Sequence, residues 1–113
     1  MEHKMRLHPK YYECMLNGTK RIEVRLNDEK RRLINIGDTI TFYKMPDEKE
    51  SILVKVVDLL HYKTFEDLLN DYDISIVADK DDSKENLLKI LNEFYSKEEQ
   101  EKYGVLGIKI KKD

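Results

Sequence analysis

Residues 17–26 form a turn followed by a short, highly charged segment: Asn17-Gly18-Thr19-Lys20-Arg21-Ile22-Glu23-Val24-Arg25-Leu26. Asn and Gly both tolerate the left-handed backbone conformation, so Asn17-Gly18 predicts a turn. Apolar residues then alternate with charged ones, which predicts a strand over residues 21–26. A strand that only fills a core has no need of four charges in six residues. We therefore expect this stretch to be the functional centre, held in place by the rest of the chain.

Side chains alternate between the two faces of a strand, so the apolar residues of 21–26 should face the core. Arg21, Glu23 and Arg25 then share the opposite face. Glu23 between two cations should stay ionised and orient Arg25, whose planar donor fork suits a phosphate or a base edge. Lys20, at the mouth of the strand, is a candidate phosphate ligand, or a base if burial lowers its pKa. The same spacing is also typical of an exposed strand preceded by a solvated lysine.

The length of the chain, 113 residues, predicts a single domain over residues 1–113 with a small core. Charged residues make up 39% and hydrophobic residues 40%, which indicates a soluble globular protein. No apolar run approaches the ~20 residues that cross a membrane, and the N-terminus lacks the apolar segment of a signal peptide. The single cysteine, Cys14, excludes an internal disulfide and is expected to serve packing. Together these features predict a cytoplasmic protein.

The net charge of −2 argues against a protein that coats nucleic acid non-specifically. The charge is nevertheless uneven, because residues 20–32 contain six basic and three acidic side chains. That local excess is compatible with a pocket for a phosphate or a nucleotide. Lys30-Arg31-Arg32 either adds phosphate contacts along one edge or forms a solvated loop.

The rest of the chain predicts strands and helices in an irregular order. Strands are expected over residues 3–7, 39–43, 51–61 and 105–111, and helices over residues 9–16, after Thr64, after Ser83 and from Ser96 to Tyr103. Residues 51–61 are apolar on both faces, which predicts a central strand. Residues 73–82 should be an acidic hinge. The helix after Ser83 should bury a stripe made of Leu87, Leu88, Leu91, Phe94 and Tyr95. This order favours an α+β fold, a small and mostly antiparallel β-barrel with flanking helices, over a doubly wound sheet.

His61-Tyr62, at the end of the long strand, is a further candidate for the site. The two rings suit stacking and hydrogen bonding to a base, or form a half-buried structural pair. His3 and His8 have no partners at metal-ligand spacing, so we predict no metal site. The chain has no phosphate-binding glycine loop, serine nucleophile elbow or zinc-protease motif, and we expect no cofactor.

Gly18-x-Lys20-x-x-Glu23-x-Arg25 resembles the GxKxxExR signature of the ASCH domain, whose fold is similar to the PUA domain, a small β-barrel with helices at its sides. Three further stretches, residues 36–42, 61–68 and 94–108, resemble the family in the same order, so the likeness covers nearly the whole chain. The resemblance implies a role with RNA or nucleotides, because the family is proposed to bind RNA in a cleft beside the motif.

The resemblance also implies an enzymatic alternative. One branch of the family removes the acetyl group from N4-acetylcytidine, and another includes a ribonuclease. In the amidohydrolase branch the motif lysine is catalytic, which corresponds to Lys20, and a threonine stands at the position of Glu23. That branch also uses a glutamate in the loop before the late helix, where this chain offers Asp79, Asp81 or Asp82.

Two functions are therefore compatible with the sequence. In a binding module for RNA, a nucleotide or a nucleoside, Lys20 and Arg25 hold phosphate while Glu23 accepts hydrogen bonds from a base or orients Arg25. Arg21 falls on a variable position of the signature and has a supporting role. In a hydrolase, Lys20 activates the nucleophile or water and Glu23 transfers the proton. No complete catalytic set can be assembled from spacing alone, which favours the binding module.

Overall fold

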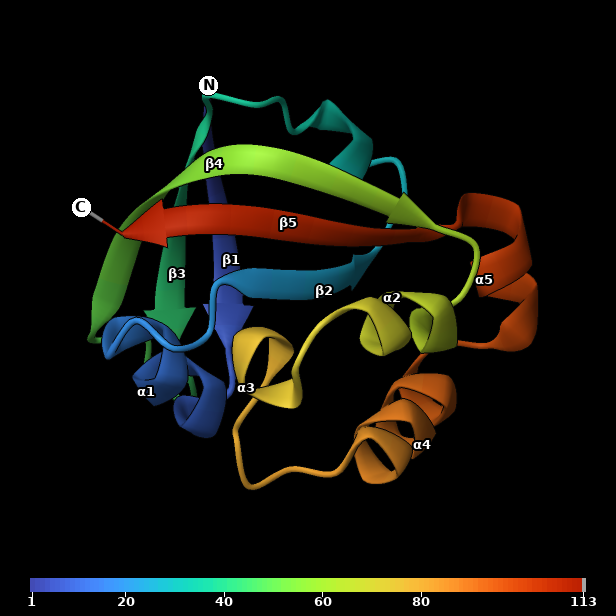
Figure 1. Cartoon of the computed structure of the whole chain (residues 1–113). Helices are drawn as coiled ribbons and strands as arrows, with labels where there is room; N and C mark the ends of the chain where they lie inside the picture. Colours follow the sequence, from blue (N-terminus) through green and yellow to red (C-terminus); the bar gives the residue numbers. More distant parts are fainter. Residues whose placement is uncertain (113) are drawn as a thin grey trace.

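A curled five-stranded sheet with helices packed against its inner side forms the molecule (Figure 1). The computed structural model describes residues 1–112. The strands are β1 (Glu2–Leu7), β2 (Ile22–Leu26), β3 (Thr39–Lys44), β4 (Ser51–Tyr62) and β5 (Val105–Lys112). The helices are α1 (Pro9–Leu16), α2 (Phe65–Asp71), α3 (Ile74–Val77), α4 (Lys84–Phe94) and α5 (Lys97–Tyr103), with a 3-10 turn, η1, at Arg31–Leu33.

The strand order is β1-β3-β4-β5-β2, with β1 parallel to β3 and the other pairs antiparallel. The predicted α+β, mostly antiparallel fold is thus confirmed, and the sheet curls into a half-barrel. Strands β1 and β2 are its two edges, and within residues 1–112 no backbone ladder joins them. The half-barrel therefore has an open side, which we call the seam.

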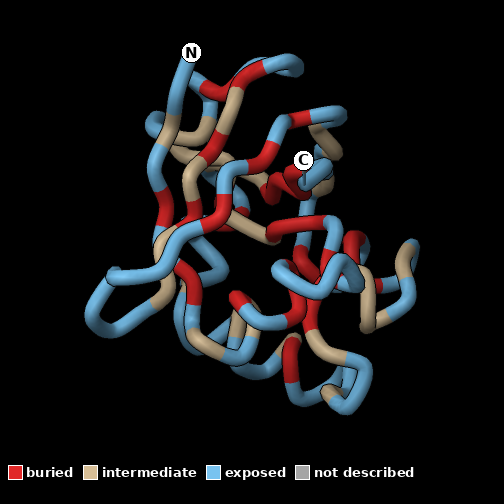
Figure 2. The backbone as a smooth tube through the Cα atoms, turned by 90° about the vertical axis from the view of Figure 1, so that its left-hand side faces the viewer, coloured by how far each residue is buried: buried red, intermediate tan, exposed pale blue. Residues whose placement is uncertain are grey.

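Strand β4 lies at the centre of the sheet, as its long apolar run predicts. Its apolar run is nevertheless buried on one face only, because buried and exposed residues alternate along its first half. Figure 2 shows the same alternation along the backbone of the sheet. Leu53 and Val57 point outward and are 53% and 38% exposed. The helices cover only one face of the sheet, so apolar side chains on the other face stay in solvent.

Two apolar clusters fill the inner side of the sheet. The first joins α1 to β1, β3, β4 and β5 and includes Met15 and Phe42. The second joins β2 to α2, α3 and α4 and includes Ile22 and Phe65. At Gly107 on β5, an added Cβ would lie 3.1 Å from Leu68 Cδ1, so the absence of a side chain lets α2 pack directly on the strand.

Local capping signals place the helices where the sequence predicts them. Helix α1 has the expected bounds, Pro9–Leu16. The side chains of Thr64 and Ser83 accept hydrogen bonds from backbone amides at the starts of α2 and α4. Ser96 and Glu99 form the predicted capping box, which satisfies donors that the first turn of α5 leaves unpaired.

Two expectations about the second half of the chain are wrong. The acidic segment 73–82 contains a helix, α3, which Asp73 caps by accepting from the amide of Ser75. The buried stripe of α4 does not include Phe94, which is 76% exposed and, like Ile90, is not part of the apolar cluster that joins α4 to α2. No helix within residues 1–112 is long and apolar enough to cross a membrane.

Candidate functional site

A hollow of about 750 Å³, which we call the cleft, lies at the seam beside the edge strands. Side chains from β1, α1, β2, α3 and α4 line it, so it collects residues that are far apart in the sequence. The lining is mostly apolar, and its charged groups lie on β1, on α1, and on β2 or just before it. The lining residues that matter for the function are Arg6, Lys20, Glu23, Arg25, Ile90 and Phe94.

Lys20 turns into the molecule, and its side chain is only 2% exposed. Its ammonium donates to the carbonyl oxygens of Ile22 at 2.6 Å and Val77 at 2.8 Å. The backbone holds this arrangement, because the amide of Arg21 donates to the carbonyl of Ile76 at 2.9 Å and so ties β2 to α3. The alternative of a solvated turn lysine is therefore wrong.

Glu23 lies between two cations, as predicted, but the first of them is Lys20 and not Arg21. Its Oε1 is 3.1 Å from Lys20 Nζ, and its Oε2 is 2.7 Å from Arg25 Nη2. Arg25 Nε also donates to Oε2, at 2.8 Å. The Arg25 guanidinium then crosses the seam, where Nη2 donates to the Arg6 carbonyl at 2.8 Å. A chain of charged side chains thus spans the gap between the two edge strands.

Burial and charge act in opposite directions on this chain of groups. Burial lowers the pKa of Lys20, and the charge of Glu23 offsets that effect only in part. Burial would raise the pKa of Glu23, but the charges of Arg25 and Lys20 outweigh it and hold this pKa below its usual value. Burial would lower the pKa of Arg25, yet the Glu23 carboxylate raises it overall. Glu23 is therefore a firmly ionised acceptor inside a largely apolar hollow.

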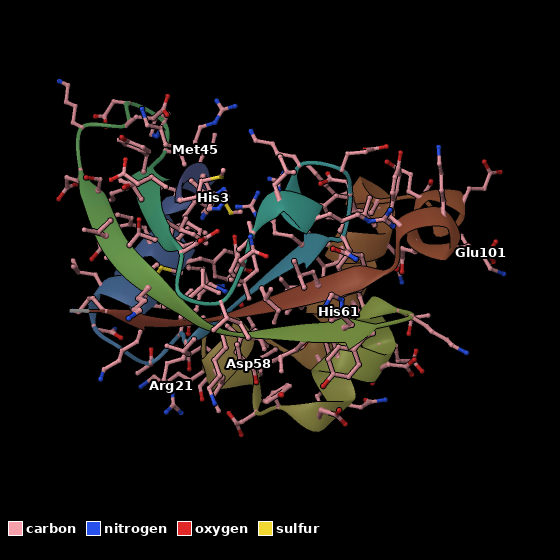
Figure 3. All side chains as sticks on the ribbon, turned by 90° about the horizontal axis from the view of Figure 1, so that it is seen from above. His3, Arg21, Met45, Asp58, His61 and Glu101 are labelled. Atoms are coloured by element: carbon pink, nitrogen blue, oxygen red, sulfur yellow. The ribbon has the colours of Figure 1, made fainter. Side chains whose placement is uncertain are left out.

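Three other predicted site residues lie away from the cleft. Arg21 is exposed and does not line it. His61 is also exposed, on the last part of β4, and the Tyr62 hydroxyl donates to Asp71 at 2.8 Å. In Figure 3, Met45, which lines the cleft, and Arg21 lie at opposite edges of the molecule, and His61 lies near its middle. The structure thus brings together Lys20, Glu23 and Arg25 without Arg21, His61 and Tyr62.

The acidic loop before α4 does not supply a carboxylate to the cleft. Asp82 pairs with Lys10 and accepts from the Tyr11 hydroxyl at 3.2 Å, which ties α1 to this loop. Asp79 accepts from Cys14 Sγ at 3.5 Å and from a backbone amide within its own loop. Neither aspartate lines the cleft, and Asp81 does not line it either. The described part of the chain contains no cluster of three or more His, Cys, Asp or Glu suited to a metal ion.

The sequence did not predict that apolar side chains of α4 form a wall of the cleft. Ile90 is 51% and Phe94 76% exposed, and both line the cleft. A signal existed in their spacing of four, which places two large apolar side chains one turn apart on the same side of a helix. Phe94 also fits the spacing of the apolar stripe of this helix, and for that reason the sequence predicts that it is buried.

Comparisons with known proteins agree with this architecture. The family model for the ASCH domain matches residues 5–113. The crystal structure of the hypothetical protein PH0355 superimposes with a TM-score of 0.86 and 37% sequence identity, covering 100% of both chains. The solution NMR structure of protein PF0455 from Pyrococcus furiosus gives a TM-score of 0.78 and 34% identity, covering 99% of this chain and 97% of that one. A comparison with curated proteins finds no match. The family model covers all but the first four residues, and the chain belongs to the ASCH domain family.

Proposed function

We propose that the cleft binds RNA or a nucleotide through a base that enters between β2 and α4. The observation that carries this proposal is the ionised Glu23–Arg25 pair on the wall of an otherwise mostly apolar hollow. A base edge offers both donors and acceptors, and a carboxylate beside a guanidinium matches both. Single-stranded RNA is recognised in this way, by hydrogen bonds to base edges and by stacking.

Within this proposal Lys20 is a positioning residue and not a phosphate ligand. Its three ammonium donors are directed at the Ile22 carbonyl, the Val77 carbonyl and Glu23. A phosphate could reach Lys20 only by displacing one of these buried partners. Lys20 instead holds Glu23 from behind, so that the carboxylate keeps a fixed orientation toward the cleft.

Phe94 and Ile90 provide the surface on which a base would stack. Both are largely exposed although they are apolar, and both line the cleft beside the charged pair. Stacking of a base on an aromatic side chain contributes about 1–3 kcal/mol and tolerates any sequence. An exposed phenylalanine that lines the same hollow as two charged hydrogen-bonding groups is thus suited to a flat, polar-edged ring.

The experiment is a binding titration of short single-stranded RNA and of nucleotides against three variants. We expect Arg25→Gln and Phe94→Ala to weaken binding at least several-fold. Arg21→Gln is the matched control, because it removes the same charge from an exposed arginine outside the cleft. Binding of RNA should also weaken as salt is raised. Equal losses for Arg21→Gln and Arg25→Gln, or no binding of any probe by the parent, would reject the proposal.

A second candidate function is hydrolysis of a modified nucleoside, which the lowered pKa of the buried Lys20 favours. A lysine of this kind can act as a base when its pKa is brought toward neutrality. Against it, the charges of Arg25 and Lys20 hold the pKa of Glu23 below its usual value, which makes it a poor group for proton transfer, and Asp79, Asp81 and Asp82 lie outside the cleft. Incubation with N4-acetylcytidine and a panel of acylated nucleosides tests it, and an absence of turnover across the panel rejects it.

A further inference from the structure

We infer that a second hollow, which shares Arg6 and Arg25 with the cleft, binds the phosphoryl group of the ligand whose base occupies the cleft. We call this hollow the basic basin; its volume is about 460 Å³. Five cationic side chains line it, which are Lys4, Arg6, Arg25, Lys30 and Arg31, together with a single carboxylate, Glu48. The inference rests on the proposed function, and its test below separates the two.

The cations of the basic basin are largely uncompensated. Lys4, Arg6 and Lys30 form no ion pair with any carboxylate among residues 1–112. Arg25 is paired with Glu23, which it shares with Lys20, and Arg31 has only a long contact with Asp28. Like charges gathered around one hollow repel each other and attract an anion. The protein as a whole has a net charge of −2, so this concentration of positive charge is a local property of the basic basin.

The poorly paired side chain of Arg31 is a second observation that supports a phosphate site in the basic basin. Its side chain is only 17% exposed, yet its nearest ion-pair contact, Nη1 to Asp28 Oδ2, is 3.7 Å, which is beyond hydrogen-bond distance. Its Nε is buried and has no hydrogen-bond partner among the described residues. Buried donors without partners are rare in native proteins. A phosphate oxygen would provide the acceptor that Arg31 lacks, after a small rotation of its guanidinium.

The neighbouring arginine shows that this state is not a general property of the loop. Arg32 Nε donates to the Asn27 carbonyl at 2.9 Å, and Arg32 Nη2 donates to the Tyr103 carbonyl at 3.3 Å. Arg32 is thus committed to holding the loop on the end of α5. Within the basic run 30–32, Arg32 therefore has a structural role, whereas the side-chain donors of Arg31 remain available.

The basic basin and the cleft are two parts of one continuous surface. Arg6 and Arg25 line both hollows, and the Arg25–Arg6 hydrogen bond lies between them at the seam. A base in the cleft would therefore place its attached sugar and phosphate across this bridge. The phosphoryl group can come from a single nucleotide or from the backbone of an RNA strand, and both present the same oxygens to Lys30 and Arg31.

The test uses the 15N-labelled full chain and heteronuclear NMR. Inorganic phosphate should shift the Arg31 side-chain Nε–H resonance in a saturable way, while that of Arg32 stays in place. The four nucleoside 5′-monophosphates should then be titrated beside the matching nucleosides. We expect at least one monophosphate to bind about tenfold or more tightly than its nucleoside, as a charge-assisted contact provides.

The decisive variant is Lys30→Gln/Arg31→Gln, compared with Lys55→Gln/Lys63→Gln, which removes the same charge at exposed positions outside both hollows. The first variant should lose the preference for monophosphates and keep nucleoside affinity, whereas the control keeps both. A titration with hexauridylate shows whether the phosphoryl group can come from an RNA strand. Binding of such a strand should weaken as salt is raised, and the Lys30→Gln/Arg31→Gln variant should reduce this salt dependence. Nucleosides that bind as tightly as monophosphates, with Arg31 unmoved by phosphate, overturn this inference and leave the proposed function standing. If no nucleoside, nucleotide or oligonucleotide binds, the proposed function is rejected instead.

Discussion

Replacing Glu23 with glutamine keeps the size of the side chain but removes the negative charge between Lys20 and Arg25. Both neighbours lie within 3.1 Å of the carboxylate, and Lys20 is almost fully buried. Removing one partner of a buried ion pair costs about 3–5 kcal/mol, because an uncompensated charge stays in a poorly solvated place. Domains of this kind are stable by only about 5–15 kcal/mol. The loss should therefore be plain in a urea denaturation curve at pH 7.

The loss caused by Glu23→Gln should also depend on pH in a defined direction. Burial already lowers the pKa of Lys20 from 10.5 in the parent, and without the carboxylate it should fall further. The unfolded chain keeps the Lys20 proton up to its ordinary pKa, whereas the folded variant releases it at a lower pH. The unfolded state then binds more protons, so folding stability rises with pH between the two values. The deficit of the variant should shrink as the buffer is raised from pH 7 toward about pH 10.

Glu101→Gln is the matched control, because it makes the same chemical change at an exposed position on α5. It should alter the free energy of unfolding by less than about 0.5 kcal/mol at either pH. A cost for Glu23→Gln no larger than that of this control would contradict the role of Glu23 as the partner of a buried charge. A large deficit that does not change with pH would contradict it too, since Lys20 would then not be the charge left unpaired.

Three further substitutions test other parts of the fold. The pKa of Asp38 is held at about 2 by hydrogen bonds from His3, a backbone amide and the N-terminal amine, so the stability it adds should disappear as pH falls from 3.8 toward that value. Acid unfolding followed by circular dichroism should lose this component in Asp38→Asn, and an unchanged acid profile would contradict it. Gly107→Ala brings a Cβ to 3.1 Å from Leu68 Cδ1 and should cost about 1–3 kcal/mol, seen as a lower melting temperature. An equal or higher melting temperature would mean that α2 can move away. Ser96→Ala removes the capping box of α5 and should cost about 1 kcal/mol in urea unfolding, whereas no change would show that the cap is dispensable.

Features that depend on neighbouring residues were predictable from the sequence. Pro9 and the Asn17-Gly18 turn bracket α1, and Ser96-x-x-Glu99 marks the start of α5, and in both cases the structure agrees. These signals work because caps and turns satisfy backbone groups within a few residues. The family signature likewise identifies Lys20, Glu23 and Arg25, which the structure places together at one wall of the cleft.

The environment of Lys20 was not predictable, because its partner is distant in the chain. The Val77 carbonyl that accepts from Lys20 lies 57 residues away, on a helix too short to produce an apolar period. Without α3, a lysine after a turn is expected to be solvated. The prediction that Phe94 is buried failed for a related reason. Periodicity shows that a helix has an apolar side, but it does not show how far the neighbouring elements cover that side.

The position of β2 at one edge of the half-barrel has a consequence for how the molecule is made. Within residues 1–112 the ladder partner of β2 is β5 alone, and β5 is the last element of the fold. During synthesis the segment containing Lys20 and Glu23 leaves the ribosome long before the strand that holds it in the sheet. Pairing across such a sequence separation is slow and must await the synthesis of β5. A nascent chain that stalls before Val105 thus carries the signature residues without the strand that fixes their geometry.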